Sequence, residues 1–454
     1  MLNKEKLEFL SKQLHEYKYH YDEILKANEL LTDILDELKE DFKKDDNVVA
    51  YHDSRIKTPN SYLNKILKHY GTNDELEYDK MHDIVAHRIV FLNLSDINEF
   101  VNLLVNCKKI NIIEPIDKRD YIKNKKESGY RSHHIILEVP FVDSDGVEQR
   151  VKAEIQLRTI LQDIFAREEH KLSYKGNGKI SEKDKKALID LSDELFFFDT
   201  SLDRMARPLK NTNKVNKKEL EKVLKEFNKT ADLYGIMYQD LNKMIQEFCD
   251  EYDKKADILH IESRIKSISS IHRKLIKKKL RFKSDDIVYG LKDVLGFKIV
   301  CTDIGTVKDF LNYFNKRIEE SDKVKINEQS DHLDVAKPSG YRGYKINLDY
   351  CPRYVADKPI TTEVLVRTMV QDAWALQQDA RVYNKENCYE NSNDYVVNEY
   401  ALRGLSFPLH RVEMLIDDVK GHNVSNETNT NNLVKEVKEY EMNKKLKLIK
   451  KDEE

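Results

Sequence analysis

Two stretches of the chain, DIVAHRIV at residues 83–90 and DVLGFKIV at residues 293–300, are almost alike. Each begins with an aspartate and continues with mostly apolar, β-branched residues, a composition typical of a buried strand. Three more short sequences recur in the same order: SRIKT as SRIKS, SGYRS as SGYRG, and EIQLRT as EVLVRT. A single match of this kind would be chance, but four collinear matches indicate a duplication.

The spacing between equivalent residues gives the size of the duplicated piece. It is 209, 210, 211 and 209 residues for the pairs Arg55/Arg264, Asp83/Asp293, Tyr130/Tyr341 and Glu154/Glu363. A piece of that length is a domain and not a solenoid repeat. Short strand-like runs alternate with helical segments in each copy, so each copy predicts an α/β or α+β unit.

The segments outside the two copies predict helices. Over residues 1–46, apolar side chains recur at alternating spacings of three and four, which indicates one long helix with a narrow apolar seam. Such a seam suits a coiled coil between chains or packing within one chain, and we favour packing within the chain. The expected order is N-terminal helix 1–46, first domain 47–178, helical connector 179–257, second, diverged domain 258–416, linker 417–432, and basic C-terminal helix or tail 433–454.

Composition limits the class of protein. Of the 454 residues, 35% are charged and 40% hydrophobic, which favours long exposed helical surfaces. No run approaches the roughly 18 apolar residues of a membrane helix, and the N-terminus lacks the apolar core of a secretory signal. The five cysteines form no CxxC pair, so we expect a protein of the reducing cytoplasm. Because the net charge is only −3, phosphate binding would depend on local basic clusters.

The repeated carboxylates predict a phosphate site that shares a metal ion. Asp83 begins one predicted strand and Glu154 lies in another. Mg²⁺ in proteins takes one or two carboxylates and completes its shell with water and phosphate oxygens. Tyr130, in a turn, offers a ring on which a base can stack. The surrounding basic side chains, which suit a polyphosphate better than a core, are Arg55, Lys57, Arg88, Lys126, Arg131 and Arg158.

Structural explanations compete with each of these assignments. Asp83 with Arg88 would form an ordinary ion pair, as would Glu154 with Arg158, and SGYR alone would form an ordinary turn. His82 followed by Asp83 matches the start of a metal-dependent HD phosphohydrolase motif, but the further His and Asp ligands are missing upstream. Neither a P-loop nor a GxGxxG sequence is present, which argues against Walker-type and Rossmann sites.

Taken together, these residues resemble the RelA/SpoT-type synthetase domain, and specifically the small alarmone synthetases. The resemblance covers residues 50–175 through SRIKTPNS, HDIVAHRIV, DYIKNKKESGYRSHH, AEIQLRT and EEHKLSYK, and covers residues 260–385 more loosely. It implies an α+β fold with two tandem synthetase-like domains, each a mixed sheet packed with helices, plus long flanking helices. It also implies transfer of the β,γ-pyrophosphate of ATP to the 3′-hydroxyl of GDP or GTP, which makes (p)ppGpp alarmones and releases AMP.

The resemblance assigns roles by position in the motifs. Asp83 and Glu154 are the implied catalytic carboxylates and ligands of Mg²⁺, and Glu154 also takes the proton of the 3′-hydroxyl. The implied ATP-binding residues are Arg55, Lys57 and Arg88, of which the two arginines sandwich the adenine. The implied acceptor-binding residues are Lys126, Tyr130, Arg131, His134 and Arg158.

The second copy departs further from the family pattern. Its principal replacements are Lys298 for Arg88, Lys345 for His134 and Leu365 for Gln156. A lysine keeps the charge of an arginine but loses its flat stacking surface. The residues that remain, and that would form a second nucleotide site, are Arg264, Lys266, Asp293, Tyr341, Glu363 and Arg367. This copy would be a weak catalyst, a regulatory nucleotide-binding domain or a mimic of an oligomer partner.

Two other functions fit the same motifs. A toxin-like relative would pyrophosphorylate adenine nucleotides or the 3′ end of tRNA, because neither Tyr130 nor Lys126 recognises the edge of guanine. A non-catalytic nucleotide sensor is less favoured, since binding alone needs no carboxylate pair. The expected partners are ATP and GDP or GTP, and the N-terminal or connector helices offer surfaces for a homo-oligomer. The motifs do not fix the acceptor nucleotide, the oligomeric state or the physiological trigger.

Overall fold

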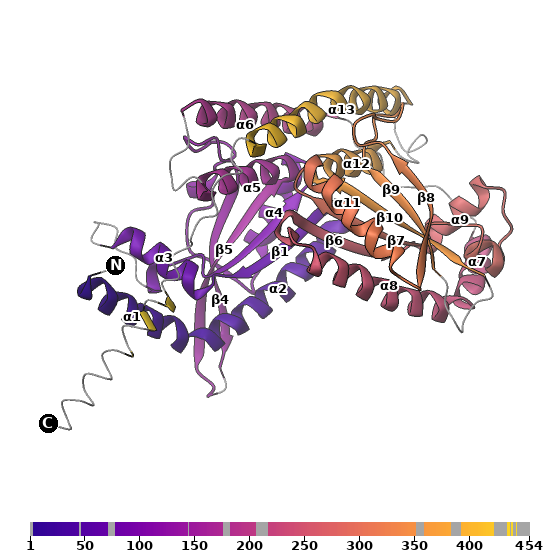
Figure 1. Cartoon of the computed structure of the whole chain (residues 1–454). Helices are drawn as coiled ribbons and strands as arrows, with labels where there is room; N and C mark the ends of the chain where they lie inside the picture. The colour runs from indigo at the N-terminus through magenta and orange to yellow at the C-terminus, as the bar shows by residue number, and fades with distance from the viewer. Residues whose placement is uncertain are drawn as a thin grey trace. The chain divides into compact units, whose positions relative to one another are not determined.

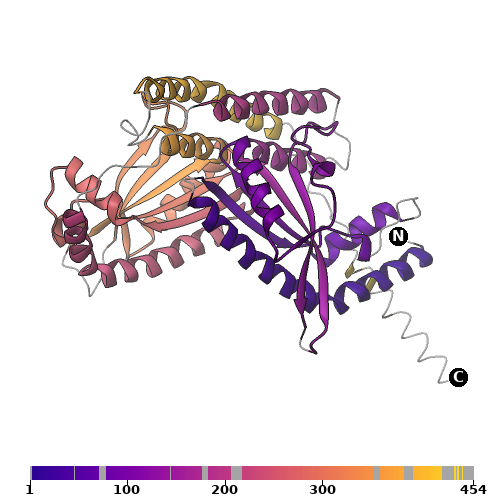
Figure 2. The ribbon, with the colours of Figure 1, turned by 180° about the vertical axis from the view of Figure 1, so that it is seen from behind.

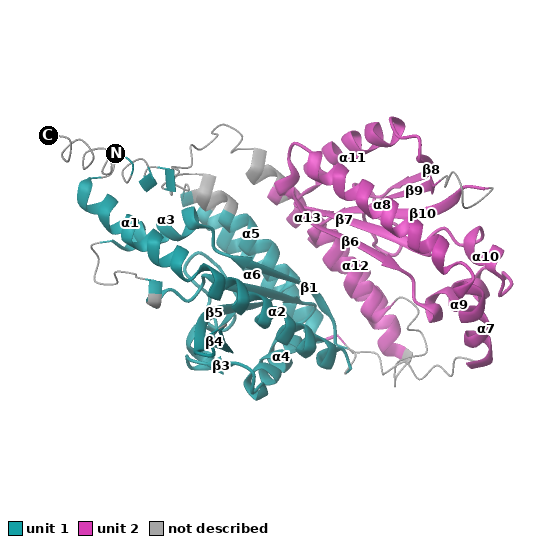
Figure 3. Cartoon of the chain, turned by 90° about the horizontal axis from the view of Figure 1, so that it is seen from below, with its two compact units in different colours: residues 1–204, 425–454 teal, residues 205–424 magenta. Residues whose placement is uncertain are grey.

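Two compact units make up the chain (Figure 3). Unit 1 comprises residues 1–204 with residues 425–454, and unit 2 comprises residues 205–424. The computed structural model describes residues 3–44, 47–70, 78–143, 145–175, 182–205, 217–350, 358–382, 392–421, 434–435, 437–438 and 442. Within that described part, no helix has an apolar stretch long enough to cross a lipid bilayer.

Two helices, and not the single helix predicted over residues 1–46, form the N-terminal segment. They are α1 (Lys4–Tyr19) and α2 (Tyr21–Lys43), and they are separated at His20. The backbone of His20 lies at φ −90° and ψ 9°, outside the helical region, and its ring contacts the Glu23 carboxylate at 2.7 Å. The periodicity of apolar residues continues across this break, which is why the sequence pattern did not reveal it.

The apolar seam of these two helices is buried within unit 1. Leu10, Leu14, Leu31 and Leu35 are all 0–1% exposed and belong to one core cluster with the sheet. α1 packs on α3 (Pro59–His69), and α2 lies along the sheet. The seam therefore packs within the chain, as favoured from the sequence, and is not free to form a coiled coil.

Unit 1 is built on a five-stranded mixed sheet (Figure 1). Its strands are β1 (Val49–Ile56), β2 (Val85–Phe91), β3 (Asn111–Ile112), β4 (His133–Val142) and β5 (Glu148–Thr159). The order is β1-β2-β5-β4-β3, with β2 parallel to β5 and all other neighbours antiparallel. The remaining long helices are α4 (Leu94–Asn106), α5 (Ile160–Lys175) and α6 (Glu182–Asp203). This architecture confirms the predicted α+β fold.

The two faces of this sheet differ in polarity because side chains alternate along each strand. Ile89, Ile155 and Leu157 are fully buried in the core that α2 and α4 cover. The opposite face carries charged residues such as Arg88 and Glu154, and α5 packs on its β2 and β5 strands. α2 and α5 lie on opposite sides of the sheet (Figures 1 and 2). The polar face is thus the part of unit 1 that is available for a site.

Unit 2 repeats the topology of unit 1. Its strand order β6-β7-β10-β9-β8 reproduces that of unit 1, again with one parallel pair, β7 with β10. The strands are β6 (Ile258–Ile265), β7 (Leu295–Cys301), β8 (Val324–Asp331), β9 (Tyr344–Tyr350) and β10 (Ile360–Thr368). The helices are α7 (Lys217–Asn228), α8 (Ala231–Glu251), α9 (Ile268–Lys277), α10 (Ser284–Val288), α11 (Ile304–Glu319), α12 (Met369–Arg381) and α13 (Ser392–Gly421). The repeat seen in the sequence is therefore a duplication of the whole sheet.

The segments between and after the two sheets are assigned differently from the sequence-based boundaries. The predicted connector is divided, since α6 belongs to unit 1 whereas α7 and α8 belong to unit 2. α13 continues to Gly421 and so occupies the first part of the predicted linker 417–432; residues 422–432 lie outside the described residues. Of the predicted tail 433–454, Val437 is fully buried in the core of unit 1.

A buried carboxylic acid joins α6 to the sheet of unit 1. Asp199 on α6 is 1% exposed and accepts a hydrogen bond of 2.7 Å from the hydroxyl of Thr159 at the end of β5. Its other oxygen, Oδ1, is buried without a hydrogen-bond partner. Burial, reinforced by the charge of Asp203, raises the pKa of Asp199 to about 8. Asp199 is therefore largely protonated at neutral pH.

We expect Asp199→Asn to stabilise unit 1 at alkaline pH. The unfolded chain ionises Asp199 near its ordinary pKa of 3.8, whereas the folded unit keeps the proton up to about pH 8. Stability conferred by the protonated group is therefore lost as pH rises between these values, and a neutral amide avoids the loss. Hydrogen exchange of the β5 amides should be about tenfold slower or more in the variant near pH 8.

The matched control is Asp190→Asn, which changes an exposed residue of the same helix and should leave exchange unaltered. The difference between wild type and Asp199→Asn should shrink as the pH is lowered toward 4. Identical β5 exchange in both proteins across this range would contradict a protonated Asp199.

Candidate active site

Strand register brings the predicted site residues into rows across the polar face of unit 1. The Cα partners in one row are Asp53, Arg88, Gln156 and His134. Those in the adjacent row are Arg55, Ala86, Glu154 and Ile136. Neighbouring strands are only about 5 Å apart, so side chains within a row can touch. Residues separated by up to about 100 positions in the sequence thus share one surface.

A buried carboxylate on α5, Asp163, organises the arginines of this face. It accepts a hydrogen bond from Arg158 Nη1 at 3.1 Å and from Arg167 Nε at 2.6 Å, and it pairs with Arg88 Nη1 at 3.3 Å. The hydroxyl of Tyr51 on β1 also donates to it. Burial alone would raise the pKa of the Asp163 carboxyl, but the three guanidinium groups outweigh burial and lower it. Asp163 is therefore a permanent anion that fixes three cations.

Two hydrogen-bonded paths lead from Arg158 to Glu154. In the first, Arg158 Nη2 donates to the Tyr130 hydroxyl at 2.9 Å, which lies 2.9 Å from His134 Nε2. His134 Nδ1 lies 3.3 Å from Glu154 Oε2. In the second, Arg158 donates to the Gln156 carbonyl oxygen, and Gln156 Nε2 donates to Glu154 Oε1 at 2.6 Å. Each carboxylate oxygen of Glu154 therefore contacts a different hydrogen-bond donor.

One protonation state satisfies both paths. Burial lowers the pKa of His134, so its imidazole is neutral at pH 7 and carries one N–H. If that proton sits on Nδ1, it faces Glu154, and Nε2 then accepts the proton of the Tyr130 hydroxyl. Burial would raise the pKa of Glu154, but the hydrogen bond and charge attraction of His134, the hydrogen bond of Gln156 and the charge of Lys65 outweigh burial and lower it. Glu154 is therefore an ionised carboxylate, and at pH 7 the two groups that contact its oxygens are a neutral imidazole and a neutral amide.

Asp83 lies just before β2 and is held by two lysines. Lys57 Nζ approaches one carboxylate oxygen at 3.1 Å, and Lys65 Nζ on α3 approaches the other at 2.8 Å. Burial would raise the pKa of Asp83, but the two ammonium groups lower it, and the charge of Glu154 acts in the opposite sense. Asp83 and Glu154 therefore lie near enough to interact electrostatically.

The donor set fits a hard divalent cation that shares its shell with a substrate. Within the described ranges no group of three or more His, Cys, Asp or Glu side chains forms a metal cage. Asp83 and Glu154 are both ionised carboxylates, and Mg²⁺ commonly takes only one or two carboxylates beside phosphate and water. The pair thus suits a metal that arrives with a polyphosphate.

The turn that carries Tyr130 is fixed by a glycine and by α6. Gly129 has φ +93°, and a Cβ there would lie 3.0 Å from the Cβ of Ser192. The hydroxyl of Ser192 donates to the carbonyl oxygen of Gly129. The Lys126 ammonium lies 4.9 Å from the centre of the Tyr130 ring, which is half-buried. A cation and an aromatic ring are therefore presented together at the edge of the site.

A family model described as a region found in RelA / SpoT proteins matches residues 54–179 and again residues 263–388, together more than half of the chain. The chain belongs to the RelA/SpoT family. The resemblance and the duplication inferred from the motifs are thereby confirmed. Residues 54–179 are the first RelA/SpoT domain, and residues 263–388 are the second.

Two curated relatives are GTP pyrophosphokinases of Bacillus subtilis (strain 168). YwaC is 37% identical over 151 residues, which are 33% of this chain and 66% of the relative. YjbM is 34% identical over 143 residues, which are 32% of this chain and 65% of the relative. The chain thus spans slightly less than two thirds of the length of each. Among solved structures, small alarmone synthetase 1 of Bacillus subtilis bound to its product pppGpp shares 29% identity, covers 41% of this chain and 94% of that chain, and has a TM-score of 0.37.

The structure brings together most of the residues that the sequence placed in the first RelA/SpoT domain, but not Arg131. The Arg131 guanidinium packs on the ring of Phe196 at 4.0 Å, pairs with Asp193 at 3.2 Å and donates to the Ile122 carbonyl. These partners hold it against α6, apart from Glu154. Arg131 therefore has a structural role in the turn, and its predicted contact with the acceptor stays a prediction.

Six residues of this site were not predicted as site residues: Gln156 beside Glu154, Lys65 beside Asp83, and Tyr51, Asp53, Asp163 and Arg167 around the arginines. Tyr51 and Asp53 alternate on β1 with Arg55, so a period-two pattern would have placed all three on one face. Asp163 and Arg167 are spaced i, i+4 on α5, which is the spacing of an ion pair on a helix. The link between β1 and α5, however, joins residues more than 100 positions apart and has no local sequence signal.

The second RelA/SpoT domain assembles the equivalent residues with different partners. Asp293 is again held by two lysines, Lys266 at 2.6 Å and Lys274. Glu363, however, is paired with the Lys345 ammonium, whereas its equivalent Glu154 faces a neutral imidazole. Of the other predicted residues of this domain, Arg264 on β6 lies in the same row as Glu363, Tyr341 lies in the turn before β9, and Arg367 on β10 lies 3.2 Å from Asp372.

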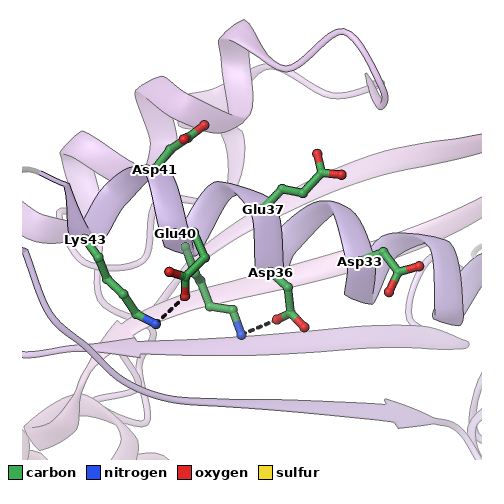
Figure 4. A pocket seen from close by; sticks show the side chains of 7 residues that line it. Asp33, Asp36, Glu37, Glu40, Asp41 and Lys43 are labelled. Carbon is green, nitrogen blue, oxygen red and sulfur yellow. Dashed lines mark hydrogen bonds and ion pairs between the residues drawn. The ribbon is translucent and has the colours of Figure 1, made fainter. Parts of the chain in front are cut away.

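A hollow on the surface of α2 is not part of this site. It has a volume of about 860 Å³ and is lined by residues of α2 alone (Figure 4). Its lining residues are Asp33, Asp36, Glu37, Lys39, Glu40, Asp41 and Lys43. Lys39 and Lys43 pair with Asp36 and Glu40 along the helix, so the hollow is a solvated, mostly acidic helix surface.

Proposed function

We propose that the first RelA/SpoT domain is a nucleotide pyrophosphokinase that transfers the β,γ-pyrophosphate of ATP to the 3′-hydroxyl of GDP or GTP. The observation that carries this proposal is Glu154, a buried, ionised carboxylate that contacts His134 and Gln156 and lies beside a second carboxylate, Asp83. The curated relatives named GTP pyrophosphokinase support the choice of reaction. ATP and guanine nucleotides are intracellular, so the proposal is consistent with a cytoplasmic enzyme.

The reaction needs a base, a positioned acceptor and neutralisation of phosphate charge. The acceptor O3′ forms a bond to the β-phosphorus of ATP while the bond from that phosphorus to the oxygen bridging the α-phosphate breaks, so AMP leaves. The proton of the 3′-hydroxyl passes to the Glu154 carboxylate. Each Glu154 oxygen accepts one hydrogen bond from the protein and retains a lone pair for this role. Phosphoryl-type transfer otherwise depends mainly on positioning and electrostatics.

Mg²⁺ would be held by Asp83 and Glu154 together with phosphate oxygens of ATP. When bound, the ion supplies positive charge that offsets the charge of the transferred group. Lys57 and Lys65 already contact Asp83 and lie where they can turn to the phosphates. Their ammonium groups would then neutralise phosphate charge in the same region.

The arginines of β1 and β2 are arranged to hold a base. Arg88 is anchored through its edge, with Nη2 2.5 Å from Asp53 and Nη1 3.3 Å from Asp163. Edge-on anchoring leaves the flat face of a guanidinium available for stacking. Arg55 lies exposed in the next row of the sheet, and the two would enclose the adenine of ATP. Lys126 and Tyr130 would receive the acceptor on the other side of Glu154.

Removing the charge of either carboxylate should abolish most of the transfer. We expect Asp83→Asn and Glu154→Gln each to lower AMP release by about 100-fold or more, because the ion and the phosphates lose a ligand charge. The measurement is AMP release from labelled ATP with GDP, GTP, ATP, AMP or tRNA as acceptor. These acceptors also separate alarmone synthesis from modification of adenine nucleotides or tRNA.

The matched control is the double variant Asp293→Asn with Glu363→Gln, which alters the equivalent residues of the second domain and should retain most of the activity. Nearly normal turnover of both first-domain variants at saturating Mg²⁺ would contradict the assignment. Loss of activity only in the second-domain variant would reverse the roles of the two domains.

Tyr130 should serve the acceptor in two separable ways. Tyr130→Ala removes a stacking surface worth about 1–3 kcal/mol and should raise the KM for the acceptor about 5- to 150-fold. Tyr130→Phe keeps the ring but breaks the path to His134, so it should lower kcat with a smaller effect on the acceptor KM. The KM for ATP should change little in both. An equal loss of affinity for ATP and acceptor would show that Tyr130 doesn't belong to the acceptor site.

A further inference from the structure

The second RelA/SpoT domain retains the turn, the aromatic ring and the lysine that we propose for nucleotide binding in the first domain. Its turn has the same construction as that of the first domain: Gly340 has φ +95°, and the hydroxyl of Ser406 donates to its carbonyl oxygen. The Lys337 ammonium lies 5.2 Å from the centre of the Tyr341 ring, as Lys126 lies by Tyr130. The cation and the aromatic ring that would receive a nucleotide are therefore both retained.

The carboxylates of this site are neutralised from within the chain. Lys345 on β9 occupies the position of His134 and contacts Glu363 Oε2. Leu365 occupies the position of Gln156, between Lys298 and Lys345 in the row, and cannot donate a hydrogen bond. Both neutral donors that hold the equivalent glutamate of the first domain are thus replaced, one by a cation and one by an apolar side chain.

The Lys345 ammonium lies within the electrostatic reach of both carboxylates that correspond to the proposed metal pair. Although burial acts against its charge, the hydrogen bond and charge of Glu363, with the charges of Asp293 and Glu328, raise the pKa of Lys345. Asp293 is held by Lys266 and Lys274 just as Asp83 is held by two lysines. The difference between the two carboxylate pairs therefore lies at Lys345. A divalent cation at this pair would face a fixed ammonium group, so these residues do not fit Mg²⁺.

The same set does fit the phosphates of a nucleotide without a metal. A lysine ammonium has three N–H donors, and at Lys345 one is used by Glu363. Lys298, in the place of Arg88, is tied to Glu262 at 2.7 Å and to Asp372 at 3.3 Å, which leaves no flat surface for an adenine clamp. The site therefore offers lysines that attract phosphate and one ring on which a base can stack. It has neither a carboxylate pair suited to Mg²⁺ nor a complete site for ATP as the donor.

Resting on the function proposed for the first domain, we propose that the second RelA/SpoT domain binds a nucleoside di- or triphosphate without a divalent cation, with Lys345 in the place of the metal, and transfers nothing. The nucleotide stacks on Tyr341, and its phosphates meet Lys345 and Lys337.

The single tryptophan of the chain gives a signal specific to this domain. Trp374 on α12 is buried, its ring lies 6.4 Å from that of Tyr341, and its indole N–H donates to the Leu402 carbonyl at 2.7 Å. A nucleotide that stacks on Tyr341 should alter Trp374 fluorescence. Binding to the first domain lacks such a neighbouring tryptophan.

The test is a titration of the full chain with GTP, ATP and inorganic tripolyphosphate in excess EDTA, followed by Trp374 fluorescence and by equilibrium dialysis of labelled GTP. We expect a saturable change of Trp374 fluorescence in EDTA that Mg²⁺ does not tighten, and equilibrium dialysis should detect this nucleotide in addition to GTP bound at the acceptor site of the first domain. Tripolyphosphate should bind more weakly than either nucleotide because it has no base to stack.

Variants of the two domains decide where the nucleotide binds. Lys345→Met and Tyr341→Ala should each weaken the binding that Trp374 fluorescence reports in EDTA by about tenfold or more, whereas Tyr130→Ala should leave that signal unchanged. Tyr341→Ala changes a half-buried ring, so it remains informative if Lys345→Met fails to fold. The proposal is overturned if no saturable Trp374 signal appears in EDTA, if both second-domain variants keep the wild-type affinity by that signal, or if Tyr130→Ala removes the signal. AMP release by the same protein reports on the first domain separately.

Discussion

The buried ion pair between Arg158 and Asp163 is the interaction on which the candidate active site depends. Asp163 also holds Arg88 and Arg167, and Arg158 directs the two hydrogen-bonded paths that end on Glu154. Breaking a buried pair leaves an uncompensated charge behind, which is strongly unfavourable. The donor side, the acceptor side and the glutamate between them are therefore held in one geometry by a single pair that links β5 to α5.

The two RelA/SpoT domains share one fold, but a few replacements change the charge that surrounds the glutamate present in both. Strand order, turn construction and the pair of lysines on the aspartate are the same in both. Around the glutamate the difference lies at two positions, where Lys345 and Leu365 stand in place of His134 and Gln156. A neutral donor orients a carboxylate and leaves its charge for a ligand, whereas a lysine cancels that charge. This distinction underlies the different functions that we propose for the two domains.

Much of this arrangement could be predicted from the sequence, because the motifs are local. The repeat, the strands that follow Asp83 and Asp293, and the paired carboxylates could be inferred from short sequences and their spacing. The network around Asp163 could not be predicted, since its partners come from β1, β2 and β5 and meet only in the folded sheet. The contacts of Arg131 could not be predicted for the same reason, because its partners on α6 are distant in sequence. The break at His20 escaped detection because apolar periodicity continues across it.

The central claim is that Glu154 is ionised beside neutral donors and that its charge is what makes the first domain catalytic. It is tested most directly by giving that domain the side chains of the second, in the double variant His134→Lys with Gln156→Leu, and measuring AMP release from ATP with GDP as acceptor. The account predicts a loss of about 100-fold or more, with β5 amides as protected from hydrogen exchange as in the wild type. Activity near the wild-type level in a folded variant would contradict it.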